Sequence, residues 1–181
     1  MKIRSAARMD RDAIGEVHVQ AFGAEEGPSI AALVNDLRRD ETAAPLLSLV
    51  AVDRERLIGH ILYSRVRVVP CEDQVSARIL APLAVLPEAW GRGVGGRLIR
   101  TGLNQLQSSG VELVFVLGHP GYYSRFGFEP AGIHGLAAPY PIPEARADAW
   151  MVRELASGAV GSVTGKVQCA RVLDQPEHWQ E

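Results

Sequence analysis

Near the middle of the chain, an apolar segment leads into a cluster of glycines: Leu83-Ala84-Val85-Leu86-Pro87-Glu88-Ala89-Trp90-Gly91-Arg92-Gly93-Val94-Gly95-Gly96-Arg97. An apolar strand pattern over 77–86 ends at Pro87, and a helical pattern follows the four glycines. Glycine lets the backbone approach a ligand closely and adopt positive φ. The first amides of a helix lack partners and carry partial positive charge. With Arg92, Arg97 and Arg100 adding full charges, this junction predicts a site for phosphate or pyrophosphate.

Several classes of protein bind a phosphate group at such a strand-to-helix junction, and the sequence distinguishes between these classes. No Lys-Ser or Lys-Thr follows the glycines, which excludes the phosphate loop of nucleotide hydrolases. The glycine pattern of dinucleotide-binding proteins is present as Gly91-x-Gly93-x-x-Gly96. In those proteins, however, the glycines follow the strand directly and an acidic residue at the end of the next strand binds the ribose. Here four residues separate the strand from the glycines, and the next strand does not end in an acidic residue. A turn that serves only packing would not need four glycines beside three arginines. Coenzyme A is the remaining class.

The elements around the loop predict a mixed α/β fold with a central sheet of about 6–7 strands and helices on both faces. We expect helices over 11–22 and from Ser29 onward, separated by a loop over 23–28. Strands 46–52 and 57–69 should form an antiparallel hairpin, while 79–86 and 111–117, joined through the loop helix, should be parallel neighbours. Further candidate strands are 2–6, 128 onward, 150–155 and 166–172.

Composition favours one globular domain over 1–181, with a core over about 1–130 and a variable C-terminal part over about 131–181. The chain has 181 residues, of which 47% are hydrophobic and 22% charged. The net charge of −2 favours neither nucleic acid nor an anionic membrane as a partner. Cys71 and Cys169 form no zinc or redox motif, and we expect no metal site. The sequence shows no apolar run of signal-peptide or membrane length, so a cytoplasmic location is expected.

The loop resembles the acyl-CoA loop of the GNAT superfamily of N-acetyltransferases, whose pattern is Gln or Arg, two residues, Gly, one residue, then Gly or Ala. Trp90-Gly91-Arg92-Gly93-Val94-Gly95 matches it, with Trp90 where the family has Gln or Arg. Tyr123-Ser124-Arg125-Phe126-Gly127-Phe128 resembles the late Tyr-x-x-x-Gly-Phe motif. Together with the segment from Val116 to Pro120, these motifs look like the YhbS-like branch. The order of elements fits over most of residues 1–130.

This resemblance implies a cosubstrate, acetyl-CoA, and a set of residues that bind it. The strands on either side of the loop helix would splay apart and admit the pantetheine, whose amides would pair with the backbone of Leu83 and Val85. The implied binding set is Leu83, Ala84, Val85, Gly91, Arg92, Gly93, Val94, Gly95, Gly96 and Arg97. Tyr123 stands at the family position of the acid that protonates the leaving thiolate. Tyr122 is the alternative donor.

The resemblance implies an acetyl-CoA-dependent N-acetyltransferase in which an amine attacks the thioester directly in a ternary complex. The candidates for the general base that deprotonates the amine are Glu25, Glu26, His119, His60 and ordered water. The sequence leaves the acceptor open between a small-molecule amine and a protein amine. A homodimer is compatible with the sequence. The alternative from another class is a non-catalytic acyl-CoA-binding sensor or interaction module.

Overall fold

The computed structural model describes residues 1–180, which form three α-helices and nine strands with short 3₁₀ turns between them. The helices are α1 (Arg11–Arg39), α2 (Val94–Ser108) and α3 (Pro120–Tyr123). The strands are β1 (Lys2–Ser5), β2 (Leu47–Asp53), β3 (Arg56–Val69), β4 (Ala77–Val85), β5 (Leu113–Leu117), β6 (Glu129–Pro130), β7 (Leu136–Ala137), β8 (Trp150–Glu154) and β9 (Gly165–Gln168).

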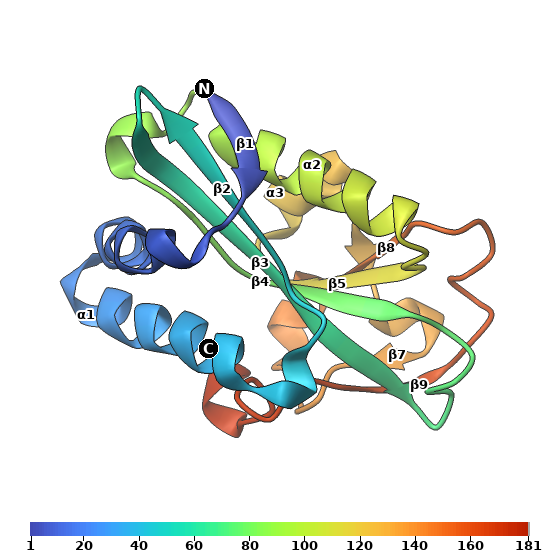
Figure 1. Cartoon of the computed structure of the whole chain (residues 1–181). Coiled ribbons are helices and arrows are strands. Elements are labelled where there is room, and N and C mark those ends of the chain that lie inside the picture. The colour runs from blue at the N-terminus through green and yellow to red at the C-terminus, as the bar shows by residue number, and fades with distance from the viewer. Residues whose placement is uncertain (181) are drawn as a thin grey trace.

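One mixed sheet organises the fold (Figure 1). Its main path has the order β1-β2-β3-β4-β5-β8-β6, and β9 pairs with the far end of β3 and with β7. Neighbours on the main path are antiparallel except β4 and β5, which run parallel because α2 carries the chain back between them. The predicted mixed sheet, its hairpin and its parallel pair are confirmed.

Helices cover both faces of the sheet, as predicted (Figure 1). Alternate β3 side chains point to opposite faces, and this period of two assigns each helix its face. Tyr63 packs against α2, where its hydroxyl donates to the Ile99 carbonyl at 3.2 Å and its ring lies against Gly102. His60, on the other face, meets His18 of α1. The core therefore has two layers, one under each helix.

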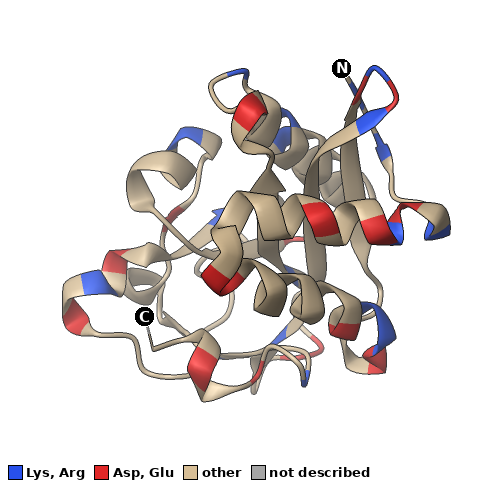
Figure 2. Cartoon of the chain, turned by 90° about the vertical axis from the view of Figure 1, so that its left-hand side faces the viewer, with Lys and Arg blue, Asp and Glu red and all other residues tan. Residues whose placement is uncertain are grey.

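The region between the two predicted helices differs from the expectation. Residues 24–28 are helical, and only Gly23 leaves the helical conformation, at φ 86° and ψ 174°. Pro28 lies near the start of the second half, where a proline costs little, and Ser29 lies inside the helix instead of capping it. The two halves of α1 run side by side (Figure 2), and a Cβ at Gly27 would lie 2.6 Å from the Val19 backbone. Tertiary packing of one half on the other thus overrides the local break signals.

Helix α1 spans 29 residues, and it has a buried apolar side and an exposed polar side. Its inward side includes Ile14, Val17, Leu33, Val34 and Leu37, and acidic residues recur on its outward side (Figure 2). Within residues 1–180, no helix combines the length and the apolar character that crossing a membrane requires.

Candidate active site

The start of α2 is built to face an anion. Gly91 and Gly93 have φ values of 76° and 75°, which glycine adopts without strain. Gly93 is the N-cap residue, no side chain caps the helix, and the first turn holds no acid. The amides of the first turn therefore have no partner within the helix and present their partial positive charge outward. The loop sequence thus folds into a turn with positive φ at two glycines, followed by an uncapped helix start; we refer to this feature as the cradle.

Beside this cradle, β4 and β5 diverge. Their pairing covers Ala77–Ile79 and Leu113–Phe115, and within the described part of the chain the rest of β4 has no partner on that side. This is the predicted splayed pair. A hollow of about 560 Å³ lies next to the open part of β4, lined by Leu83 and Val85, by the glycine loop and by Tyr122, Arg125 and Phe126, but not by Tyr123. An elongated ligand can therefore lie with one end on the α2 amides and its length along β4.

The outer wall of the hollow carries aromatic rings and positive charges. The Arg125 guanidinium lies 4.8 Å from the centre of the Tyr122 ring, and that of Arg100 lies 4.9 Å from the Phe126 ring. Both arginines line the hollow. Burial raises the pKa of the half-buried Tyr122, while Arg125 and Arg100 oppose that shift. These cationic groups add to the helix amides, so the hollow favours an anionic ligand.

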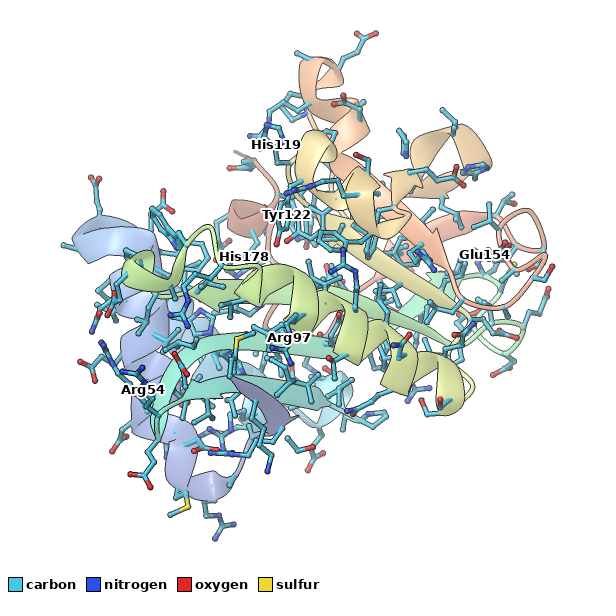
Figure 3. The ribbon with its side chains drawn as sticks, turned by 90° about the horizontal axis from the view of Figure 1, so that it is seen from above. Arg54, Arg97, His119, Tyr122, Glu154 and His178 are labelled. Atoms are coloured by element: carbon cyan, nitrogen blue, oxygen red, sulfur yellow. The ribbon has the colours of Figure 1, made fainter. Side chains whose placement is uncertain are left out.

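The structure brings together most of the predicted binding residues. Those that line the hollow are Leu83, Val85, Gly91, Gly93, Val94, Gly95 and Gly96. Ala84 is buried beside them, and Arg97 is drawn on the side of the α2 ribbon away from Tyr122 (Figure 3). Arg92 forms an ion pair with Asp53 at 2.8 Å, with half of its side chain exposed.

Several residues that line the hollow are not in the binding set that the family resemblance implied. Trp90, Arg100, Arg125 and Phe126 all line it. Trp90 is 63% exposed, and its indole N–H donates to the Val85 carbonyl at 2.8 Å. The signals available were the helical spacing that puts Arg100 one turn after Gly96, and the Arg-Phe pair inside the late motif. Neither signal shows which side chain faces the ligand.

The two tyrosines of the late motif face different parts of the site. A Cβ at Gly95 would lie 2.6 Å from the Tyr122 hydroxyl, so Tyr122 stands over the start of α2 (Figure 3). The Tyr123 ring lies against Gly118, directly after β5, and meets Phe128 edge to face. Burial, with Tyr122 beside it, raises the pKa of Tyr123 well above its ordinary value. Tyr123 therefore remains a protonated donor at neutral pH.

All four side chains proposed as the base, namely Glu25, Glu26, His119 and His60, lie outside the lining of the hollow. Glu25 and Glu26 are exposed on the second half of α1, in a helix and not in the predicted loop. His119 is exposed and caps α3 by accepting from the Gly121 amide at 3.2 Å. These positions set Glu25, Glu26 and His119 apart from the glycine loop.

His60 belongs to a buried chain of hydrogen bonds. His18 Nε2 lies 2.8 Å from His60 Nδ1, and Ser48 Oγ lies 2.8 Å from His60 Nε2. Both imidazoles are fully buried. Burial lowers the pKa of His18 to about 4 and that of His60 to about 3, and the positive charge that His18 would carry adds to the effect on His60. Both rings are therefore neutral at pH 7, each with one N–H to donate.

Comparison with known proteins agrees with this geometry. The family model described as "Acetyltransferase (GNAT) domain" matches residues 2–131. The chain is 47% identical over 164 residues to the uncharacterized N-acetyltransferase YjhQ of Escherichia coli K12, with 90% of this chain and 88% of the relative covered. It is 37% identical over 169 residues to the uncharacterized N-acetyltransferase YhbS of the same strain, with 93% and 95% covered.

Two solved structures share the fold. The YhbS structure from Escherichia coli in complex with CoA has a TM-score of 0.85 at 35% identity, covering 96% of this chain and 92% of that one. A GNAT family acetyltransferase from Brucella melitensis in complex with acetyl-CoA has a TM-score of 0.75 at 30% identity, covering 95% and 97%. The chain therefore belongs to the GNAT family of N-acetyltransferases, which confirms the resemblance drawn from its motifs.

Proposed function

We propose that the protein binds acetyl-CoA in the hollow between β4 and α2 and transfers the acetyl group directly to an amine. The observation that carries this proposal is the meeting of an uncapped helix start with an open strand edge. The pyrophosphate would accept hydrogen bonds from the Val94, Gly95 and Gly96 amides. The pantetheine would lie along Leu83 and Val85 as an added strand would, because amide groups along an open edge can pair with amides of a ligand. The CoA and acetyl-CoA complexes of the two relatives support this placement.

In the proposed reaction the neutral amine nitrogen attacks the thioester carbonyl carbon. The carbon–sulfur bond breaks as the tetrahedral intermediate collapses, and the sulfur leaves with the bonding electron pair. Tyr123 gives its phenolic proton to that sulfur, and the proton lost by the amine passes to a base or to water. The place of Tyr123 after β5, where the strands have diverged, supports this role over Tyr122, whose hydroxyl stands at the cradle.

Two substitutions test the acid. Tyr123→Phe keeps the ring and removes the proton, and it should lower kcat roughly 10–10³-fold, with acetyl-CoA affinity nearly unchanged. The matched Tyr122→Phe variant should lose far less. Turnover is measured as free CoA released from acetyl-CoA across a panel of amines and peptides. Full turnover by Tyr123→Phe, with chemistry rate-limiting, would remove the assignment.

Binding is tested separately at the cradle. Gly95→Val places a side chain where the Tyr122 hydroxyl and the ligand must lie, so calorimetry should show a severe loss of acetyl-CoA affinity. Arg92→Ala should cost less, on the order of 1–2 kcal/mol, because the guanidinium is half exposed and already paired. Unchanged affinity in Gly95→Val would place the ligand elsewhere.

The same amine and peptide panel addresses the acceptor and the sensor alternative. Family membership favours an enzyme, and the acceptor is proposed as a small-molecule or protein amine. Binding of acetyl-CoA without CoA release on any member of a broad panel would favour the acyl-CoA sensor.

A further inference from the structure

A second cationic hollow lies far from the glycine loop, on β3 near its pairing with β9. It has a volume of about 160 Å³ and is lined by Thr42, Arg65, Arg67, Gln168, Cys169 and Arg171. Gly59 marks the α2 end of β3, since a Cβ there would touch Val94. From Gly59 to Arg65 is six residues, which is about 20 Å along the strand. In Figure 1 this region of β3 and β9 lies away from the start of α2.

The polar lining of this hollow consists mainly of hydrogen-bond donors. Arg65 and Arg67 are two residues apart on β3, so both point to the same face of the sheet. Arg171 and the Gln168 side-chain amide approach from β9 and the segment after it. Among residues 1–180, no carboxylate lines the hollow. Three guanidiniums with fixed N–H forks are what a multivalent oxyanion requires.

A fourth arginine increases the positive charge. Arg78 of β4 stands directly across from Arg65 in the antiparallel register, where like charges repel. Burial lowers the pKa of Arg78, and Arg65 contributes to the shift. Over residues 1–180, none of the ion pairs within 4 Å includes any of these four arginines. The repulsion between them is therefore not offset by a direct carboxylate contact.

The acidic groups nearby bond to other donors or line a different hollow; burial opposes the lowering of the Asp40 pKa, while hydrogen bonds from Thr42 and Val172 and the charge of Arg171 produce it. The Asp40 carboxylate accepts from the Thr42 amide and hydroxyl and from the Val172 amide, at 2.8, 2.5 and 3.0 Å. Glu72, Asp73 and Glu112 line an adjoining hollow with Arg65, Arg67 and Arg78, and Glu112 accepts from the Ser76 amide at 3.0 Å. The carboxylates thus lie around the donor-lined hollow but not in it.

The walls of the hollow are held by backbone contacts. Gln168 faces Arg67 in the β3–β9 ladder. The Arg171 amide donates to Thr42 Oγ1 at 3.0 Å, which ties the segment after β9 to the turn after α1. Three segments distant in sequence are therefore fixed around one small space, and a ligand there would not have to order them first.

We propose that this hollow binds a phosphate group, either free phosphate or the monoester of a small metabolite, as an anion site separate from the acetyl-CoA site. A phosphate monoester carries close to two negative charges and three acceptor oxygens at pH 7, enough for guanidiniums arriving from two sides. A single carboxylate would satisfy one arginine fork and leave the others unpaired. The proposal does not rest on the proposed transferase mechanism.

The test is calorimetric titration of the full chain with inorganic phosphate, glycerol 3-phosphate and succinate at low ionic strength. We expect Arg65→Gln and Arg171→Gln each to weaken phosphate binding at least 10-fold. Arg146→Gln, an exposed arginine outside the hollow, is the matched control and should leave it unchanged. These substitutions are on the surface, so the variants should fold, and acetyl-CoA binding should stay unchanged in all three.

The ligand panel distinguishes the sources of phosphate. Tighter binding of glycerol 3-phosphate than of inorganic phosphate supports a metabolite site, and the reverse order supports free phosphate. No measurable phosphate binding by the unsubstituted protein overturns the proposal, as does equal binding by Arg65→Gln and Arg171→Gln. Succinate binding as tight as phosphate would overturn the choice of ligand.

Discussion

Acid should destabilise this protein through one buried pair of side chains, His18 and His60. The two imidazoles lie 2.8 Å apart and are fully buried, and their pKa values in the folded chain are about 4 and about 3. In the unfolded chain each returns to about 6.5. Because the folded pKa values are the lower ones, the unfolded state binds more protons below pH 6.5. The stability contributed by the neutral pair is therefore present above pH 6.5 and is lost as pH falls toward 4.

The size of the loss in the free energy of unfolding follows from the difference between the folded and unfolded pKa values of each histidine. At pH 5 both rings are still mostly neutral in the folded chain, while both are protonated after unfolding. Each ring then favours the unfolded state by about 2 kcal/mol relative to pH 7, so the pair accounts for about 4 kcal/mol. That is a large part of the 5–15 kcal/mol typical of domains. The lowered carboxyl pKa values of Asp10, Asp40 and Asp53 take effect only near pH 4 and below.

Urea unfolding at pH 7, 6 and 5, followed by circular dichroism, measures this effect. His18→Gln keeps a polar partner for His60 but removes one titrating group, so the loss between pH 7 and pH 5 should fall from about 4 to about 2 kcal/mol. Val17→Ala, one residue earlier in α1, should lower stability by a similar amount at each pH. A loss below about 1 kcal/mol in the unsubstituted protein, or an undiminished loss in His18→Gln, would refute the reasoning.

Two further predictions concern Trp90 and Gly27. In the unsubstituted protein the ligand must break the hydrogen bond from the Trp90 indole N–H before it can pair with the Val85 carbonyl. Trp90→Phe removes this hydrogen bond, so calorimetry should show acetyl-CoA binding about 2–10-fold tighter. Binding weakened by a similar factor would mean that the indole N–H stays in use when the ligand is bound. Gly27→Ala forces a Cβ to 2.6 Å from the Val19 backbone and should cost about 1–3 kcal/mol in denaturant unfolding. Gly15→Ala, in the same helix with open space around it, should instead stabilise by about 0.5–1 kcal/mol, and equal effects of the two substitutions would contradict the packing argument.

The sequence alone determined the core of the fold and the cradle. Glycines at 91 and 93 between a strand pattern and a helical pattern permit a left-handed turn into an uncapped helix, and that chemistry is local. The same locality explains the hairpin at 53–56 and the Gly110 helix end, where φ is 91°. The parallel pairing of β4 and β5 also followed, because a helix between two strands of one sheet returns the chain in the same direction.

Which side chains face the site depends on contacts between distant segments of the fold. The sequence placed Arg92 by the glycines, yet Asp53, at the end of the hairpin strand β2, holds it in an ion pair. It could not show that Tyr122 stands over α2 while its neighbour Tyr123 lies against Gly118, directly after β5. Adjacent residues in a short helix point about 100° apart, and the elements packed around them determine which one reaches a ligand.

Packing between distant segments also explains the features that local sequence patterns do not predict, namely the helix after Gly23 and the buried histidine pair. Gly23 and Pro28 predict a loop, but the close approach of Gly27 to Val19 makes a helix there part of a packed pair. His18 and His60 have no sequence relation that joins them; they meet because α1 lies across β3. Local chemistry fixes how each segment can fold. The partners of a buried or charged side chain come from segments far away in the chain, so they exist only once the whole fold has formed.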